Sequence, residues 1–254
     1  MSGKISKWII VFIGSVSTLI VNAQKDSSVE TITASDLESH VSFLASPLLM
    51  GRMNGEKSLE IAAAYLAAQA KFIGLNPANG DSYFQTYTVD RENTETLTLK
   101  NVAGYIEGSD PVLKNEVVIF SGHYDHIGGR GDEIYAGADD NASGCAALLE
   151  MAQAFLSLEI KPLRTILFLW FSGEEIGLFG SAAYVKNPLF PLENTVVDLN
   201  MDMIGRVKRA ADTGDQNPMS GPNTAFIITG NQSSELRAIV DKVEIGRASC
   251  RERV

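Results

Sequence analysis

The sequence predicts an α/β fold with a mainly parallel central sheet and helices on both faces. Short apolar runs recur at 116–120, 165–171 and 195–201, and their length and composition are typical of buried strands. Segments with helical periodicity alternate with these runs, as in folds built from strand–helix–strand units. The 254 residues are 45% hydrophobic and 20% charged, which suits one domain with a sizeable core.

The amino-terminal end has the three-part layout of a secretory signal peptide. Lys4 and Lys7 precede an apolar run at 8–21, and Ala23 supplies the small residue at the expected cleavage position. The run is short for a membrane-spanning helix, although an uncleaved anchor is the alternative. We therefore expect residues 1–23 to be a signal peptide and the mature protein to be exported, periplasmic or extracellular.

The carboxyl-terminal end departs from the pattern before it. Residues 244–254 interrupt the helical periodicity of residues 233–243 and resemble the in-frame translation of a sequencing adapter. A frayed basic tail is the alternative. We expect 244–254 to be a non-native tail, and 24–243 to be one domain whose C-terminal part is missing.

The charge of the chain limits its partners. The formal net charge of −10 argues against nucleic acid and against an anionic membrane surface, so no stable membrane partner is expected. The same charge is compatible with bound cations. Cys145 is alone if Cys250 belongs to the tail, so no internal disulfide is expected.

Helices are expected both before and after the first buried strand. A capping-box pattern at 35–38 begins a short helix, and residues 56–72 form a longer one with Ile61 and Phe72 on its apolar side. A glycine-punctuated loop at 48–55 joins them. The other expected elements are strands at 84–91 and 97–107 and helices at 145–158 and up to residue 187, the last with Leu178, Ala182 and Val185 on one face.

Two adjacent acids follow the strand expected at 165–171. The strand ends at Ser172 and Gly173, and Glu174 and Glu175 come next. Acids at the carboxyl end of a buried strand face the crevice in which open α/β folds keep their sites. One acid could bind a cation while the other moves a proton. Taken alone, such a pair is more often a solvated acidic turn.

The other two buried strands also run directly into histidine or acidic residues. His123 and Asp125 follow the run at 116–120, and Asp202 follows the run at 195–201. The ends of parallel strands meet at one edge of a sheet, so these side chains would gather there. Asp125 could orient the ring of His123. A mixed nitrogen and oxygen set favours zinc or a similar first-row ion over calcium.

Each of these features has a purely structural alternative. Asp139 and Asp140 lie in a tight loop before a helix, where such residues commonly cap it. His123 could be a hydrogen-bonded core residue, and Asp202 could close a turn. Their shared position at one sheet edge favours a site. His40 has no acidic or histidine neighbour at ligand spacing, and we interpret it as structural or solvated.

Four ordered motifs resemble the M28 family of zinc aminopeptidases. They are GHYDHIG at 122–128, GADDNASG at 137–144, FSGEEIGLFGS at 171–181 and NMDMIG at 200–205. The upstream strings SFLASPLLMGR and YFQTYTVD resemble exported bacterial members, so the resemblance covers nearly all of 24–243. It implies a zinc-peptidase/phosphorylase-like fold and an exopeptidase that removes N-terminal amino acids from peptides with a free N-terminus.

The resemblance also implies roles for individual residues. The metal ligands would be His123, Asp140, Glu175 and Asp202. His123 and Asp202 would bind one zinc ion and Glu175 the other, with Asp140, rather than Asp139, bridging the two. The Asp140–Asn141 peptide bond would be cis. Glu174 would be the general base acting on a zinc-activated water, and Asp125 would orient His123.

One zinc ligand of the family has no counterpart in this sequence. The family supplies a further histidine downstream of the NMDMIG motif to the zinc held by Glu175, and no histidine follows Asp202. His126 follows His123 so closely that it is a poor substitute. We therefore expect a two-zinc site whose second position lacks its histidine, in a truncated chain that is poorly active or inactive.

Two other functions stay open. A non-catalytic binding protein on the M28 fold would explain the absent histidine, although Glu174 and Glu175 are both present. A glutaminyl-cyclase-like enzyme would use a related scaffold with a single zinc. The intact acid pair favours the peptidase over both.

Overall fold

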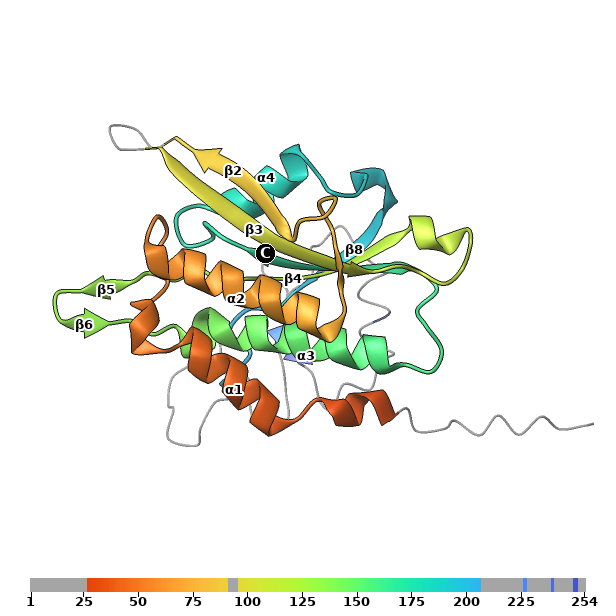
Figure 1. The fold of residues 1–254 in the computed structure, drawn as a ribbon, viewed down its shortest axis with the longest axis horizontal. Coiled ribbons are helices and arrows are strands. Elements are labelled where there is room, and N and C mark those ends of the chain that lie inside the picture. Colours follow the sequence, from red (N-terminus) through yellow and green to blue (C-terminus); the bar gives the residue numbers. More distant parts are fainter. Residues whose placement is uncertain (1–26, 91–95, 207–225, 228–238, 240–248, 251–254) are drawn as a thin grey trace, which may run out of the picture.

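Strand β7 (Thr165–Phe171) lies in the middle of the main sheet, and all of its side chains are buried. In the computed structural model, which describes residues 27–90, 96–206, 226–227, 239 and 249–250, the sheet lies between helices (Figure 1). The expected signal peptide lies outside the described residues, as does most of the expected tail. The remaining strands are β1 (Asn76–Pro77), β2 (Phe84–Val89), β3 (Leu97–Ile106), β4 (Val117–His123), β5 (Gly129–Arg130), β6 (Glu133–Ile134), β8 (Thr195–Asn200), β9 (Phe226–Ile227) and β10 (Ser249–Cys250).

The sheet has a parallel part and an antiparallel part. The main sheet of the described residues has the order β1-β3-β7-β4-β8, and β2 also pairs with β3. Strand β4 is parallel to both β7 and β8, whereas β3 is antiparallel to β7, β1 and β2. The predicted fold class is thus confirmed, and the strands expected at 116–120, 165–171 and 195–201 are parallel neighbours. The expectation that the third of them is buried is wrong, since β8 pairs only with β4 among the described strands and none of its residues is buried. The antiparallel part comes from strands whose direction the sequence pattern did not reveal.

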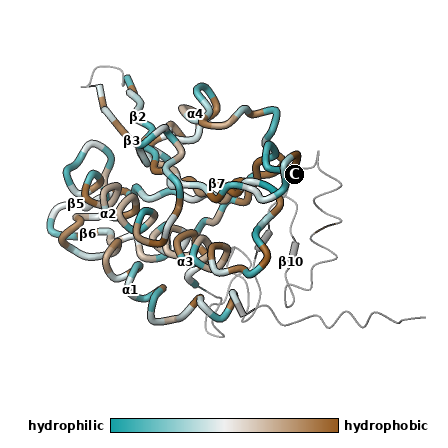
Figure 2. Tube along the Cα trace, turned by 45° about the vertical axis from the view of Figure 1, so that its right-hand side comes forward, coloured by the Kyte–Doolittle hydropathy of each residue, from teal (hydrophilic) through white to brown (hydrophobic). Residues whose placement is uncertain are grey.

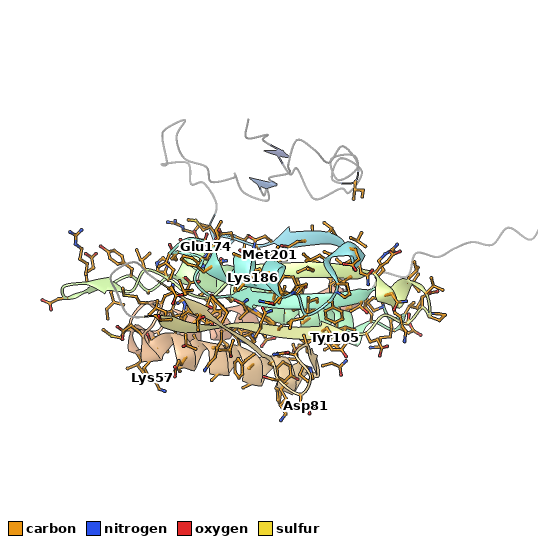
Figure 3. The ribbon with its side chains drawn as sticks, turned by 90° about the horizontal axis from the view of Figure 1, so that it is seen from above. Lys57, Asp81, Tyr105, Glu174, Lys186 and Met201 are labelled. Carbon is orange, nitrogen blue, oxygen red and sulfur yellow. The ribbon has the colours of Figure 1, made fainter. Side chains whose placement is uncertain are left out.

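Helices cover both faces of this sheet. They are α1 (Ala34–Leu44), α2 (Lys57–Ile73), α3 (Gly144–Ser157) and α4 (Phe179–Lys186), with short helical turns at η1 (Ser27–Thr31), η2 (Pro47–Leu49), η3 (Leu113–Asn115), η4 (Ala138–Ser143) and η5 (Leu192–Asn194). Figure 3 shows the layers edge-on, with Lys57 at the start of α2 on one side of the sheet and Lys186 at the end of α4 on the other. The alternation of strands and helices along the chain produces this layering. Among the described residues, none of the helices combines the length and the apolar character needed to cross a bilayer.

Alternate side chains of β7 supply two separate cores, because successive residues of a strand point to opposite faces. Phe168 and Trp170 pack against the α1–α3 layer, and Leu167 and Leu169 pack with Tyr184 of α4. Figure 2 shows the hydrophobic residues concentrated along β7 and α3. Each fully buried large apolar side chain contributes about 1.5–3 kcal/mol, so β7 is held firmly in the middle of the sheet.

The buried side of α2 is not the one that the sequence predicts. Ile61 is 44% exposed and Phe72 is 85% exposed. The buried residues of this helix are Ser58, Leu59, Ala62, Ala63, Leu66, Ala67 and Ala70. The buried side thus combines two leucines with small alanine side chains, and Ile61 and Phe72 are left on the outer side. Leu178 and Val185, expected to share one face of the helix before residue 187, are exposed, whereas Gly180 and Tyr184 of α4 are buried.

The first helix begins and is anchored differently from the prediction. Its N-cap is Thr33, whose hydroxyl accepts a hydrogen bond from the backbone N–H of Asp36 at 3.1 Å. His40 bridges the helical layer, with Nδ1 2.7 Å from the Tyr65 hydroxyl and Nε2 3.3 Å from Glu150 Oε1. The structural interpretation of His40 fits these contacts, although its acidic neighbour is distant in sequence.

Candidate metal centre

The ends of β4, β7 and β8 bring the predicted site residues to one edge of the sheet. In the parallel register His123 lies opposite Phe171 of β7, and Ser121 lies opposite Asn200 of β8. The chain therefore leaves all three strands at the same level. Gly173, with a φ of +70°, turns the chain after β7, and only glycine adopts that conformation easily.

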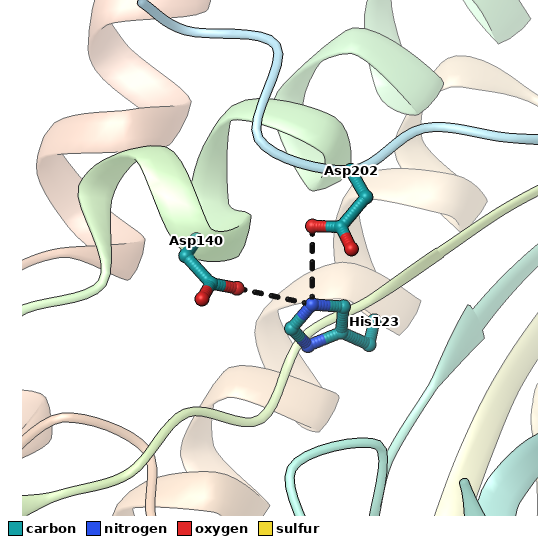
Figure 4. Close-up of side chains that lie close together, drawn as sticks. All are labelled: His123, Asp140 and Asp202. Carbon is teal, nitrogen blue, oxygen red and sulfur yellow. Dashed lines mark ion pairs between the residues drawn. The ribbon is translucent and has the colours of Figure 1, made fainter. Parts of the chain in front are cut away.

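A first group of possible ligands forms around His123. Its Nε2 lies 3.1 Å from Asp140 Oδ1 and 3.5 Å from Asp202 Oδ1 (Figure 4). One ligand atom from each of these residues lies within 4.8 Å of the others, close enough to hold a metal ion. The resemblance to the M28 family implies all three residues as ligands of the same cation, and the fold brings them together from three separate segments.

The tautomer of His123 suits a ligand. Its Nδ1 lies 3.1 Å from the backbone oxygen of Asp125, and this oxygen can only accept, so Nδ1 carries the proton. Nε2 is then available to a cation. Burial lowers the pKa of His123, but hydrogen bonds to Asp125, Asp140 and Asp202 outweigh it and raise the pKa overall. A surplus of carboxylates around one ring is the charge pattern that a cation would neutralise.

The loop that carries Asp140 is built around an irregular turn. The helical turn η4 is broken by non-helical backbone angles at Asp140 and Asn141, and the peptide bond between them is cis, as the resemblance implies. The Asn141 side chain donates to the Met201 carbonyl at 2.9 Å and accepts from the Gly144 N–H at 3.0 Å. The amide thus fastens the Asp140 loop to the segment that carries Asp202.

The neighbouring Asp139 faces away from this group. Its carboxylate accepts from the Gly205 N–H at 2.9 Å and from Arg206 Nε at 2.7 Å. Asp140 therefore lies beside His123 and Asp139 does not, which agrees with the choice that the family motif implies.

A second group of possible ligands lies on the other side of Asp140. It consists of His126, Asp140 and Glu175. His126 Nδ1 is 2.7 Å from Glu175 Oε1 and 4.0 Å from Asp140 Oδ2. This geometry differs from the expectation that His126 follows His123 too closely to replace the missing histidine ligand. His123 lies nearer to Oδ1 of Asp140 and His126 nearer to Oδ2, so the two imidazoles lie close to different oxygens of one carboxylate.

Asp125 joins the end of β4 to the turn after β7. Its carboxylate accepts from the backbone N–H groups of Glu174 and Glu175, both at 3.2 Å. The same carboxylate lies 3.7 Å from His123 Nδ1, farther than the Asp125 backbone oxygen. The expected contact between the Asp125 carboxylate and the His123 ring is therefore a weaker one than the contact made by the backbone.

Glu174 belongs to neither group of ligands and borders a cavity. The cavity has a volume of about 290 Å³ and is also lined by His123, Asp202, Phe171 and Leu178. Burial raises the pKa of Glu174, as do the charges of Glu175 and other acids, while His123 lowers it. A half-buried carboxylate of raised pKa, open to a cavity beside a cation group, suits proton transfer.

Comparisons with known proteins place these motifs in a family. The model of peptidase family M28 matches residues 101–247. Leucine aminopeptidase 1 of Trichophyton rubrum is 31% identical over 188 residues, which cover 71% of this chain and 46% of the relative. Leupeptin-inactivating enzyme 1 of Streptomyces exfoliatus is 32% identical over 177 residues, covering 68% and 36%. This chain therefore spans less than half the length of these curated relatives.

Solved structures share the fold at lower identity. LapB from Legionella pneumophila superimposes with a TM-score of 0.66 at 21% identity, covering 92% of this chain and 58% of that one. Glutaminyl cyclase from Porphyromonas gingivalis superimposes with a TM-score of 0.56 at 19% identity, covering 69% and 61%. At these identities the likeness extends to the fold alone.

Proposed function

The chain belongs to peptidase family M28, and on that premise we propose that it forms the core of a metal-dependent aminopeptidase. The substrates would be peptides with a free N-terminus, cleaved after their first residue. The observation that carries the proposal is the position of Asp140. Its Oδ1 lies near His123 and its Oδ2 lies nearest His126, so one carboxylate faces both candidate cation groups.

The donor sets fit zinc. Each group combines an imidazole nitrogen with carboxylate oxygens, a mixture that suits zinc better than calcium or magnesium. His123, Asp140 and Asp202 would hold one ion, and Asp140, Glu175 and His126 would hold the other. When bound, the ions supply Lewis acidity, which lowers the pKa of a water molecule and polarises a carbonyl group.

Glu174 would move the proton in this reaction. It lies outside both ligand groups and lines the same cavity as His123 and Asp202. Its carboxylate would take a proton from the attacking water and deliver it to the amine that leaves. Asp125 would hold the Glu174–Glu175 turn against the end of β4, through the two backbone N–H groups whose hydrogen bonds it accepts.

The substrate would be oriented by charge. The cavity is bordered by the acids Glu174, Asp198 and Asp202, which favour a positively charged N-terminal amine. A blocked N-terminus would lose this attraction. We place the reaction outside the cytoplasm, in keeping with the signal peptide expected at residues 1–23.

Glutaminyl cyclisation is the second candidate, because a glutaminyl cyclase is among the proteins that share the fold. The presence of two cation groups rather than one among the described residues favours the peptidase. A binding protein without activity is the third. It would hold ions without turning over a substrate.

The deciding experiment combines zinc analysis with three substrates. We expect about two zinc ions per chain, hydrolysis of aminoacyl-4-nitroanilides by the protein that contains this domain, and no hydrolysis of the N-acetylated substrates. Release of cyclised product from a glutaminyl peptide would favour the cyclase. Zinc binding without any turnover would favour the binding protein.

A further inference from the structure

The loop between η2 and α2 contains a buried arginine that the proposed chemistry does not use. Arg52 is 0% exposed, and a buried charge normally needs a charged partner. Among the described residues no carboxylate lies within 4.0 Å of its guanidinium, which donates only to backbone carbonyls. Burial lowers its pKa accordingly. Burying a guanidinium without a carboxylate partner costs free energy. The segments that Arg52 connects explain why it is buried here.

The guanidinium joins two loops that carry candidate ligands. Nε donates to the Tyr124 carbonyl at 2.7 Å, between His123 and Asp125. Nη1 and Nη2 donate to the carbonyls of Ala136 and Gly137 at 2.8 and 2.9 Å, just before the Asp140 loop. Nη1 also donates to the Leu44 carbonyl at the end of α1. The rigid fork of donors in arginine can hold several acceptors in a fixed relation.

Asn54 joins the third ligand-bearing segment. Its Nδ2 donates to Asp125 Oδ2 at 2.5 Å, and its Oδ1 accepts from the Gly173 N–H at 3.0 Å. Gly173 immediately precedes Glu174 and Glu175. Both polar ends of one buried amide are thus used between β4 and the turn after β7.

The backbone of the same loop reinforces these contacts. The N–H of His126 donates to the Arg52 carbonyl at 3.1 Å, and the N–H of Gly128 donates to the Gly51 carbonyl at 3.0 Å. A Cβ on Gly51 would collide with the carbonyl oxygens of Gly128 and Tyr135. The loop therefore lies directly against the segment that contains His126.

We propose that Arg52 and Asn54 are positioning residues, which set the separation of the two cation groups by tying the His123–His126, Asp140 and Glu174–Glu175 segments to one loop. This inference rests on the proposed cation sites. Neither residue would touch an ion or a substrate. Loss of either would let the ligand-bearing segments drift apart and would weaken ion binding.

The test measures zinc affinity by competition with a chromophoric chelator in four variants. R52K keeps the charge but not the fork of donors, N54A removes both contacts of the amide, and N54D keeps the acceptor for Gly173 while placing a second carboxylate against Asp125. R130K alters an exposed arginine of β5 and serves as the control. We expect about 10- to 100-fold weaker zinc binding for R52K and N54A, a larger loss for N54D, and no change for R130K.

Far-UV circular dichroism on the same samples separates positioning from folding. Should R52K fail to fold, N54A and N54D decide. Folded N54A and N54D that bind zinc as tightly as the parent protein would overturn the inference. If the parent protein binds zinc and cleaves no substrate while the variants still bind more weakly, the proposed peptidase activity fails and the positioning role stands. If the parent is an active peptidase and the variants bind normally, the positioning role alone fails.

Discussion

The imidazole of His126 lies 2.7 Å from the carboxylate of Glu175, although the two residues come from different strand ends. The pair completes a group of three possible ligands with Asp140. We expect H126A to lose about one zinc ion per chain and to keep the ion held by His123, Asp140 and Asp202. Elemental analysis after dialysis measures this. H40A, which changes a histidine outside both groups, is the control and should keep both ions.

Unchanged zinc content in H126A would mean that His126 only positions Glu175 by a hydrogen bond. The distinction matters because a ligand and a positioning residue predict different stoichiometries for the same contact.

Glu174 and Glu175 are adjacent, yet we expect their amide variants to differ. E174Q should lower the rate of peptide hydrolysis by about 10²–10⁴-fold, the usual contribution of a general base, with both zinc ions retained. E175Q should lose affinity for zinc, because Glu175 belongs to the second ligand group. Steady-state kinetics and zinc analysis on the same preparations check this. Equal zinc loss in both variants would contradict separate roles.

The pKa of Glu174 can be measured directly. Because burial raises it, we expect ¹³C-carboxyl NMR of the metal-free protein to give a pKa above that of an exposed glutamate. The native state then binds this proton more tightly than the unfolded state does. Stability is therefore lost as the pH rises from the unfolded pKa to the folded pKa.

The same shift predicts the behaviour of E174Q. The metal-free variant should melt at a higher temperature than the parent at neutral pH, and the difference should vanish below the unfolded pKa of the carboxyl group. Thermal melts at both pH values test this. A variant that melts lower than the parent at neutral pH would contradict the sign.

The packing of α2 allows a paired test of which side is buried. Leu66 is fully buried and Phe72 is 85% exposed. We expect L66A to lower the free energy of unfolding by about 2–5 kcal/mol and F72A to change it by less than about 0.5 kcal/mol. Urea denaturation measures both. A large loss in F72A would show that the apolar side predicted from the sequence is the packed one.

The strands and the residues at their ends could be predicted because both signals are local. Apolar runs long enough for a buried strand lead directly to His123 and to Glu174, and the parallel order of the strands then brings the ends together. The side of α2 could not be predicted in this way. Periodicity selects large apolar residues such as Phe72, whereas close packing on the sheet selected alanines.

Contacts between loops also could not be predicted from the sequence. His126 contacts Glu175 across 49 residues, and Arg52 contacts Gly137 across 85 residues. Neither contact has a periodic signature, since each depends on how two loops meet once the sheet has formed. A buried arginine surrounded by carbonyl groups looks like any surface arginine in a sequence.

Trp170 has a practical consequence for all of these experiments. It is fully buried, its indole N–H donates to the Cys145 carbonyl at 3.2 Å, and the Cys145 thiol in turn donates to the backbone carbonyl of His123. Residues 24–254 contain no second tryptophan, so in this part of the chain the emission excited selectively at tryptophan arises from one indole, two contacts away from the proposed zinc ligand. Zinc titrations followed by that emission would report, in a single cuvette, whether loading the ions alters the environment beneath them.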